Sequence, residues 1–446
     1  MLKSLRIQNF KAWKDTGEIR MAPITLLFGG NSSGKSSIGQ FLMMLAQTTA
    51  SPDRRAVFNS GNKNTAVQLG SYKEMVHKRD PEKQISFSYC WNINDPKDTI
   101  LDRIFDHNKL CFFDANIFLS EATPKVKTLN YTLVSVIDHK WAFGMEYDTE
   151  TGLYKMSTNF EISRRLGRPA LIAAPLRFYG FPDEVVANYN NVDFLQDFNL
   201  YQERLFESIY YLGPLRSKAE RLYSWTGIRP DSVGYSGENT IAALLAAKDR
   251  KIAHGKKKSE PFLALIARQL KEMNLIDDFK VEKISKTRED YEVQVRTHGS
   301  DQYVDLPDVG FGISQVLPVL VQAYYAPHNS IIIMEQPEIH LHPDAQARLA
   351  DVMIDVIKSK ENGILRNVQL IIETHSEHFL RRLQRRIAEE RITTSDVAMY
   401  FANKLKLAPL EVDENGRIAN WPENFFGNTV EDIMTINMAA AKRVKK

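Results

Sequence analysis

The stretch that decides the fold is Gly29-Gly30-Asn31-Ser32-Ser33-Gly34-Lys35-Ser36, which satisfies the pattern G-x-x-x-x-G-K-[ST]. Before it, the apolar run 24–28 has the length and composition of a buried strand. After it, the apolar residues of 37–45 recur at helical spacing. A glycine-rich turn between a strand and a helix presents backbone N–H groups at the positive end of the helix dipole, where phosphate binds. The sequence therefore predicts a site for a nucleoside triphosphate.

Two side chains of this loop have specific predicted roles. The Lys35 ammonium is expected to reach the β- and γ-phosphates, and the Ser36 hydroxyl is expected to ligate Mg²⁺. The rest of the loop is expected to surround the phosphates. The predicted nucleotide-binding residues are Asn31, Ser32, Ser33, Gly34, Lys35, Ser36 and Ser37.

The composition is that of an ordinary globular chain with room for two or three domains. Of its 446 residues, 25% are charged and 43% hydrophobic, and the net charge is +3 at pH 7. No apolar run approaches the roughly 20 residues of a membrane span, and the start alternates like a strand rather than a signal peptide. Two cysteines, Cys90 and Cys111, are too few for a disulfide framework or a four-cysteine zinc site. We expect a cytoplasmic protein with no membrane partner.

Two further runs, in the second half of the chain, end in residues suited to phosphate chemistry. Residues 330–334 are followed by Glu335, and the mostly apolar run 368–372 is followed by Glu373-Thr374-His375. Such runs are typical of strands buried on both faces of a parallel sheet, whose carboxyl ends meet at one edge. We expect Glu335 to hold Mg²⁺ at this edge, in the manner of a Walker B acid.

The order and spacing of these motifs resemble those of a known family. Lys35 and Glu335 are 300 residues apart, so a large insertion separates two halves of one nucleotide-binding domain. This order resembles the ABC-type ATPase heads of the SMC and RecF kind, and Leu2–Lys11 looks like their opening strand. His375 matches their switch histidine, which senses the γ-phosphate.

The segment Asp308–Gln315 looks like the signature motif of those heads, in a degenerate form. The resemblance implies that Gly312 and Ser314 meet the γ-phosphate bound to a second protomer. It also implies an α/β fold: a P-loop NTPase of the ABC-ATPase head type, with a mixed sheet, helices on both faces, an inserted lobe and a small C-terminal α+β segment. The expected divisions are an N-terminal part of the head at 1–95, an inserted lobe at 96–205, a C-terminal part of the head at 206–390 and the small segment at 391–446.

A narrower resemblance rests on Glu335–Pro343, Tyr211–Arg216 and Trp421–Phe426. These stretches are similar to bacterial AAA-type ABC ATPases that are related to OLD-family proteins and occur in phage-defence systems such as Septu. The resemblance implies ATP and Mg²⁺ as cofactors, a homodimer or higher oligomer formed through the heads, and a separate nuclease as effector. Only 71 residues follow His375, and they hold no D-x-D pair, so we expect no built-in TOPRIM nuclease.

One position departs from the hydrolytic ABC pattern. Those heads carry a glutamate after the Walker B acid, and this chain has Gln336. Glutamine orients water but takes no proton from it, so we expect slow hydrolysis rather than none. Glu338 either takes over this task or only caps the following segment, and the sequence leaves both open. The predicted catalytic residues are Gln336, Glu338 and His375.

Three functions are compatible with these motifs. The first is a slow ATPase that acts as an oligomeric switch and regulates a nuclease in anti-phage defence. The second is a RecF-like clamp in DNA repair, in which basic runs such as Lys256–Lys258 and Arg381–Arg386 touch DNA phosphates. The third is a structural subunit that holds ATP without turnover.

Overall fold

The fold is built around a six-stranded sheet. The computed structural model describes residues 1–93, 109–134, 140–165, 167, 172–255, 258–285, 287–423, 425–426, 434–438 and 443. The sheet has the strand order β10-β17-β20-β4-β21-β22. Its strands are β10 (Ile209–Leu212), β17 (Ile331–Glu335), β20 (Gln369–Glu373), β4 (Ile24–Gly29), β21 (Val397–Asn403) and β22 (Lys406–Pro409). The first five are parallel and β22 is antiparallel, so the predicted mixed sheet is confirmed.

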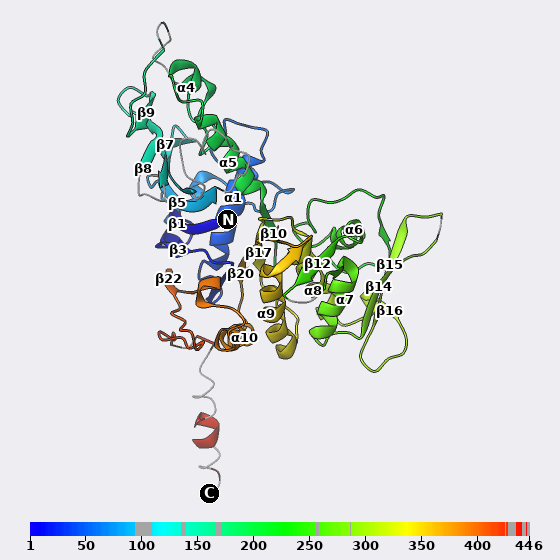
Figure 1. Ribbon diagram of the computed structural model, residues 1–446. Helices are drawn as coiled ribbons and strands as arrows, with labels where there is room; N and C mark the ends of the chain where they lie inside the picture. Colours follow the sequence, from blue (N-terminus) through cyan, green and yellow to red (C-terminus); the bar gives the residue numbers. More distant parts are fainter. Residues whose placement is uncertain are drawn as a thin grey trace.

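Both faces of this sheet are buried, which explains the continuous apolar runs of its strands. Along β17, Ile331 and Ile333 belong to one hydrophobic cluster, and Ile332 and Met334 belong to a second. Helices contribute to both clusters, as predicted (Figure 1). On the first side lie α1 (Lys35–Thr49) and α5 (Leu195–Glu207); on the second lie α6 (Thr240–Ala246), α7 (Phe262–Glu272), α8 (Phe311–Tyr325), α9 (Pro343–Ile357) and α10 (Glu377–Ala388).

An eight-stranded antiparallel sheet contributes to the first cluster. Its order is β2-β1-β5-β6-β7-β8-β9, and β3 also pairs with β1. Because β6 to β9 continue the sheet that β1 and β5 begin, the expected boundary near residue 95 falls inside one sheet. The strands are β1 (Leu2–Phe10), β2 (Trp13–Asp15), β3 (Ile19–Arg20), β5 (Ile85–Ile93), β6 (Lys109–Ser120), β7 (Thr123–Val134), β8 (Lys140–Tyr147) and β9 (Tyr154–Thr158).

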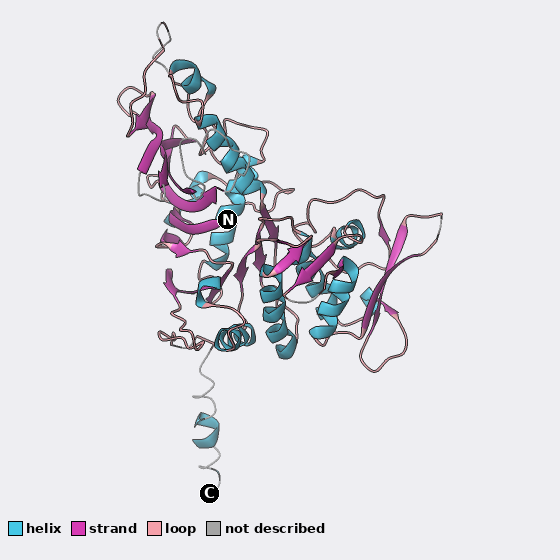
Figure 2. Cartoon of the chain, viewed as in Figure 1, coloured by secondary structure: helices cyan, strands magenta, loops and turns pink. Residues whose placement is uncertain are grey.

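Two small antiparallel sheets complete the second side (Figure 2). One consists of β11 (Tyr223–Ser224), β14 (Asp278–Lys283), β15 (Asp290–Arg296) and β16 (Val304–Asp305). The other consists of β12 (Lys251–His254), β13 (Glu260–Pro261), β18 (Ser359–Glu361) and β19 (Ile364–Leu365). Short helical elements are α2 (Tyr72–Met75), α4 (Asp183–Asn188), η1 (His77–Arg79), η2 (Leu306–Asp308) and η3 (Thr394–Asp396).

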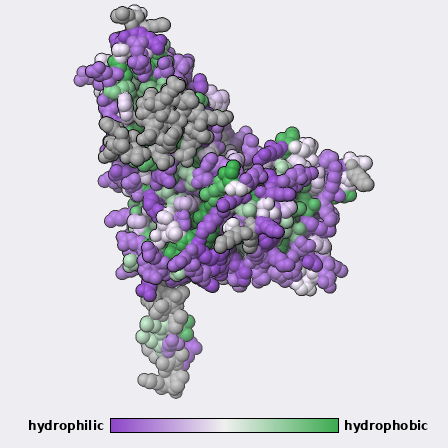
Figure 3. All heavy atoms as spheres, in the orientation of Figure 1, coloured by the Kyte–Doolittle hydropathy of each residue, from purple (hydrophilic) through white to green (hydrophobic). Residues whose placement is uncertain are grey.

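The C-terminal part of the chain joins the central sheet. Strand β21 lies beside β4, so residues after 391 contribute to the same layer as the phosphate loop. Of the basic runs named above, Lys256 and Lys257 lie outside the described residues. No described helix has both the length and the hydropathy that crossing a bilayer requires. The face drawn in Figure 3 is mostly hydrophilic, with small apolar patches.

Candidate nucleotide site

The phosphate loop joins the buried strand β4 to helix α1, as the sequence predicts. Gly29 and Gly34 have φ angles of 142° and 95°, which strain any residue with a side chain. A Cβ at Gly29 would lie 2.2 Å from the Ala402 carbonyl oxygen, so β21 also requires glycine there. The indole Nε1–H of Trp13 donates to the Gly34 carbonyl at 2.9 Å and fixes the end of the loop.

The predicted nucleotide-binding residues line this turn at different depths. Asn31 and Ser32 are exposed, Ser33, Gly34 and Ser36 are half-buried, and Lys35 and Ser37 are buried. Within the described residues, the Ser33 Oγ has no hydrogen-bond partner. A buried hydroxyl without a partner is costly, and phosphate oxygens would satisfy it. The loop thus has the form and the free polar group of a phosphate cradle.

The Lys35 ammonium is held in place by the loop and by a carboxylate. Its Nζ donates to the Gly29 and Gly30 carbonyl oxygens at 3.0 and 2.8 Å and lies 3.7 Å from Glu373 Oε1. Burial lowers the pKa of Lys35, and the negative charge of Glu373 opposes this shift. An incoming phosphate would replace the loop carbonyls as partners of a cation that is already in position.

Two carboxylates stand side by side at the carboxyl edge of the sheet. Glu335 and Glu373 are register partners at the ends of β17 and β20, and each is 7% exposed. The Tyr211 hydroxyl donates to Glu335 Oε1 at 2.8 Å, and burial, followed by the charge of Glu373, raises the pKa of Glu335 to about 7. Glu373 Oε2 has no hydrogen-bond partner within the described residues.

These observations fit a divalent cation. Two adjacent buried carboxylates with one orphaned oxygen carry more negative charge than Lys35 alone balances. Oxygen ligands are those that Mg²⁺ prefers. Glu335 and the Ser36 hydroxyl are the residues that would hold the ion, which would neutralise charge on the β- and γ-phosphates.

The three predicted catalytic residues meet at this edge. Gln336 follows Glu335 with a φ of 46°, and its backbone N–H donates to the Glu373 carbonyl at 2.8 Å. Glu338 is 6% exposed, and its Oε1 accepts the His375 backbone N–H at 2.8 Å. Glu338 therefore ties the loop of His375 to the end of β17. Burial raises the pKa of Glu338, while burial and the nearby Lys35 charge lower the pKa of His375.

Arg216 supports the same edge through its hydrogen bonds, and the sequence predicts no role for it. It lies in the loop after β10, and its Nη2 and Nη1 donate to the carbonyl oxygens of Glu335 and Gln336 at 3.1 and 3.5 Å. Burial lowers its pKa to about 10, against the charge of Glu338. In the sequence, the stretch Tyr211–Arg216 indicates only a family resemblance.

Sequence reasoning also missed Glu373 and Trp13, although the position of Glu373 in the sequence could have indicated its role. Like Glu335, Glu373 is an acid at the end of a buried strand, and that position alone would have marked it. Lys11 is a further neighbour: its Nζ donates to Gln40 Oε1 at 2.7 Å, and its charge interacts with that of Glu335. Nothing in the spacing of Trp13 or Lys11 points to the phosphate loop.

The predicted signature residues belong to a different layer. Helix α8, which carries Gly312 and Ser314, packs against α6, α7 and α9, whereas α1 packs against α5, β4, β10 and β20. A Cβ at Gly312 would lie 2.8 Å from the His340 carbonyl oxygen, so this glycine allows α8 to approach the loop after β17. The Ser314 hydroxyl donates to the Phe311 carbonyl at 2.9 Å.

Solved structures with a detectable likeness include heads of SMC proteins. An SMC head bound to the C-winged helix domain of ScpA is 12% identical, with a TM-score of 0.41, and the match covers 92% of this chain and 97% of that one. The SMC head domain from Thermotoga maritima is 10% identical, with a TM-score of 0.37, and the match covers 92% of this chain and 99% of that one.

Comparisons of sequence point to the same chemistry as the site. A Helicobacter pylori (strain ATCC 700392 / 26695) protein named ATP/GTP phosphatase is 22% identical over 433 residues, which are 97% of either chain. Residues 392–436 match a family described as a protein of unknown function, DUF3696. The model of the AAA ATPase domain matches residues 1–163 and 235–380, well over half of the chain, and includes the phosphate loop, Glu335 and His375. The chain therefore belongs to the AAA ATPase domain family and is an ATPase.

Proposed function

We propose that this ATPase is a slow, nucleotide-dependent switch. ATP and Mg²⁺ bind at the phosphate loop, two ATP-bound chains associate through their nucleotide sites, and the associated form controls a separate nuclease in defence against phage. Asn31 to Ser37 surround the phosphates, Ser36 and Glu335 hold Mg²⁺, and His375 senses the γ-phosphate. Its location in this proposal is the cytoplasm, where ATP and phage DNA meet.

The observation that carries the proposal is Gln336. It occupies the residue after Glu335, at the carboxyl edge of the sheet, and its backbone is held by Glu373 and Arg216. An amide there orients water without accepting its proton, so the ATP-bound state outlives a normal catalytic cycle. A long-lived bound state suits a switch better than a motor.

Association of two chains is supported by the separation of the predicted site residues. Gly312 and Ser314 are carried by α8, and the phosphate loop leads into α1, which packs on the opposite side of the central sheet. The site of one chain is completed when the α8 N-terminus of a second chain reaches its γ-phosphate. Symmetric pairing of two copies would complete both sites at once.

The effector and the defence role rest on the resemblance of Glu335–Pro343 and Tyr211–Arg216 to ATPases of phage-defence systems. The two stretches are in contact: the Tyr211 hydroxyl donates to the Glu335 carboxylate, and Arg216 donates to the Glu335 backbone carbonyl. ATP-dependent association would then be the signal that the nuclease reads.

A phage challenge tests the proposal. Cells that carry the native operon are compared with cells that carry Lys35→Ala in it. Lys63→Ala is the control, because Lys63 is exposed and lies outside the phosphate loop and the other motifs. We expect the wild type and Lys63→Ala to reduce plaque formation and Lys35→Ala to give none of this protection. An operon that gives no protection against a broad phage panel, or equal protection with Lys35→Ala, would contradict the proposed role.

A further inference from the structure

A second cavity lies away from the phosphate loop. It has a volume of about 620 Å³ and is walled by β12, α7, α9 and α10, with residues from each in its lining. The volume falls within the range of about 300–1,000 Å³ that is usual for small-molecule sites. No residue assigned to the nucleotide site lines it.

The lining has an excess of positive charge. Three carboxylates, Glu272, Asp351 and Asp355, face it. Against these three stand five cations, an excess of two within the lining, although Asp344 and Glu389 just outside it pair with Arg348 and Arg386. The cations are Arg348, Lys358, Arg382, Arg386 and Arg391.

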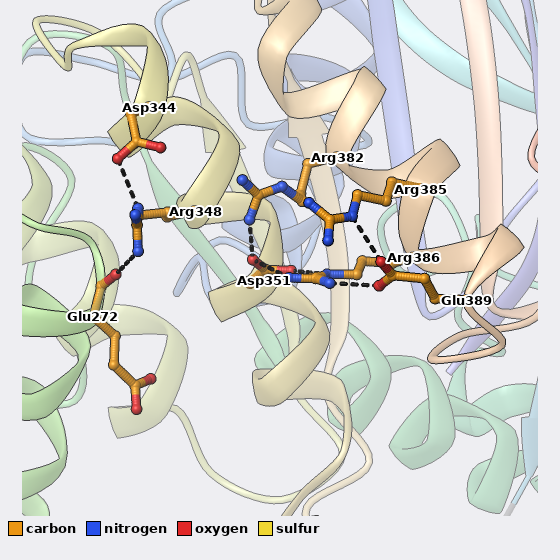
Figure 4. A network of polar contacts seen from close by, with 8 residues as sticks. All are labelled: Glu272, Asp344, Arg348, Asp351, Arg382, Arg385, Arg386 and Glu389. Atoms are coloured by element: carbon orange, nitrogen blue, oxygen red, sulfur yellow. Dashed lines mark hydrogen bonds and ion pairs between the residues drawn. The ribbon is translucent and has the colours of Figure 1, made fainter.

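One carboxylate serves two of the guanidinium groups, as Figure 4 shows. Asp351 of α9 accepts from Arg382 Nη1 at 2.5 Å and from Arg386 Nε and Nη2 at 2.5 and 2.9 Å. Arg386 also bonds to Glu389 at 2.5 Å, whereas Arg382 bonds to Asp351 alone among the described residues. With side chains 18% and 13% exposed, Arg382 and Arg386 are held in place rather than extended into solvent.

Two more cations of the lining, Lys358 and Arg391, are exposed and have N–H donors that the described residues do not use. The Lys358 ammonium donates to the Arg391 carbonyl oxygen, which fixes the two residues side by side. In the described part of the chain, neither side chain forms an ion pair. A planar guanidinium and a three-donor ammonium are the groups that bind phosphate oxygens.

We propose that this cavity binds a small phosphate-bearing ligand of about nucleotide size, at a site distinct from the phosphate loop. The cations gather around one hollow and not along an extended stripe, which favours a compact anion over a nucleic-acid backbone. Asp351 holds Arg382 and Arg386 oriented, and the ligand phosphate takes the donors that Arg382, Lys358 and Arg391 leave free. This inference does not depend on the proposed switch function.

The position of the cavity would let its ligand influence the nucleotide site. Helix α9 begins after the loop of His340, and α10 begins at Glu377, with Ser376, the residue after His375, as its N-cap. The Ser376 hydroxyl donates to Gln346 Oε1 at 2.6 Å, so the first turns of the two helices are joined. Asp351, Arg382 and Arg386 join the same helices further along, where the ligand would bind.

Titration calorimetry with pyrophosphate tests the site. Because the phosphate loop also accepts pyrophosphate, we expect the wild type to take up two per chain and Lys35→Ala to take up one. In Lys35→Ala, adding Lys358→Gln or Arg391→Gln should weaken the remaining binding about tenfold, since each removes a charge-assisted bond. The matched control is Arg385→Gln on α10, because Arg385 is not in the lining and its charge is screened by solvent.

Several results would overturn the proposal. One is a single pyrophosphate per wild-type chain that Lys35→Ala abolishes. Another is a second pyrophosphate that Arg391→Gln and Arg385→Gln weaken equally. A third is tight binding of a DNA oligonucleotide, sensitive to Arg391→Gln, without binding of pyrophosphate, which would make the rim a nucleic-acid surface. If Lys35→Ala does not fold, the double variant Lys358→Gln/Arg391→Gln tests the proposal instead. It should bind one pyrophosphate per chain, where the wild type binds two.

Discussion

Gln336→Glu should accelerate ATP hydrolysis. The substitution keeps the length of the side chain and leaves the backbone contacts with Glu373 and Arg216 in place. It adds a carboxylate to the segment that carries Glu335 and Glu338, whose negative charges would raise the pKa of the new group and so make it a better base near neutral pH. Lys35 and Arg216 supply the compensating positive charge.

The expected rise in kcat follows from the catalytic contributions that the wild-type site already makes. A well-placed general base is worth about 10²–10⁴-fold in rate. Phosphoryl transfer depends mainly on position and charge, which Lys35 and the loop supply in the wild type. We therefore expect about a tenfold rise in kcat, equivalent to about 1.4 kcal/mol of activation free energy.

The assay is steady-state phosphate release at saturating ATP and Mg²⁺. The charge-matched control is Gln302→Glu, an exposed position on the second side of the molecule, which should leave kcat unchanged. The faster variant should also dwell for less time in the ATP-bound state and lose control of the effector while still binding ATP. Unchanged or reduced turnover in Gln336→Glu would mean that this side chain does not touch the attacking water, and Glu338 would be tested next.

Three further substitutions test the roles of single residues. Lys35→Ala should weaken ATP binding about 100-fold in calorimetry, because phosphate charge loses its buried counterion, and wild-type affinity would refute the loop assignment. Ser36→Ala should weaken binding more with Mg²⁺ than with EDTA; equal losses would remove its role as a metal ligand. Glu373→Gln should lower kcat about tenfold with little change in ATP affinity, since it removes the carboxylate beside Lys35 and Glu335, and an unchanged kcat would show that this carboxylate is dispensable.

The local parts of the site were predictable from the sequence because local patterns encode them. The phosphate loop lies between β4 and α1 as expected, and Glu335 ends a strand whose alternate residues enter two separate clusters. Both features follow from runs of a few residues. The backbone of Gln336 also lies at the carboxyl edge of the sheet, where the resemblance to ABC heads puts it.

The long-range contacts were not predictable, because no local period reports them. Lys35 lies near Glu373 across most of the chain, and Arg216 bonds to the backbone of Glu335 from 119 residues away. Strand β21 was expected in a separate C-terminal segment, yet it pairs with β4 in the central sheet. Choice of strand partner depends on tertiary packing, and a strand pattern gives only the face that is buried.

The most direct test of the central claim mixes two inactive variants. If the site of one chain needs α8 of another, Lys35→Ala and Ser314→Arg are each inactive alone, but a mixed pair has one intact site, formed by the Lys35 of one chain and the Ser314 of the other. An equimolar mixture should recover about a quarter of the wild-type ATPase rate, because random pairing makes half of the pairs mixed and each has one working site of two. A mixture as inactive as its components would contradict the claim that two chains share each nucleotide site.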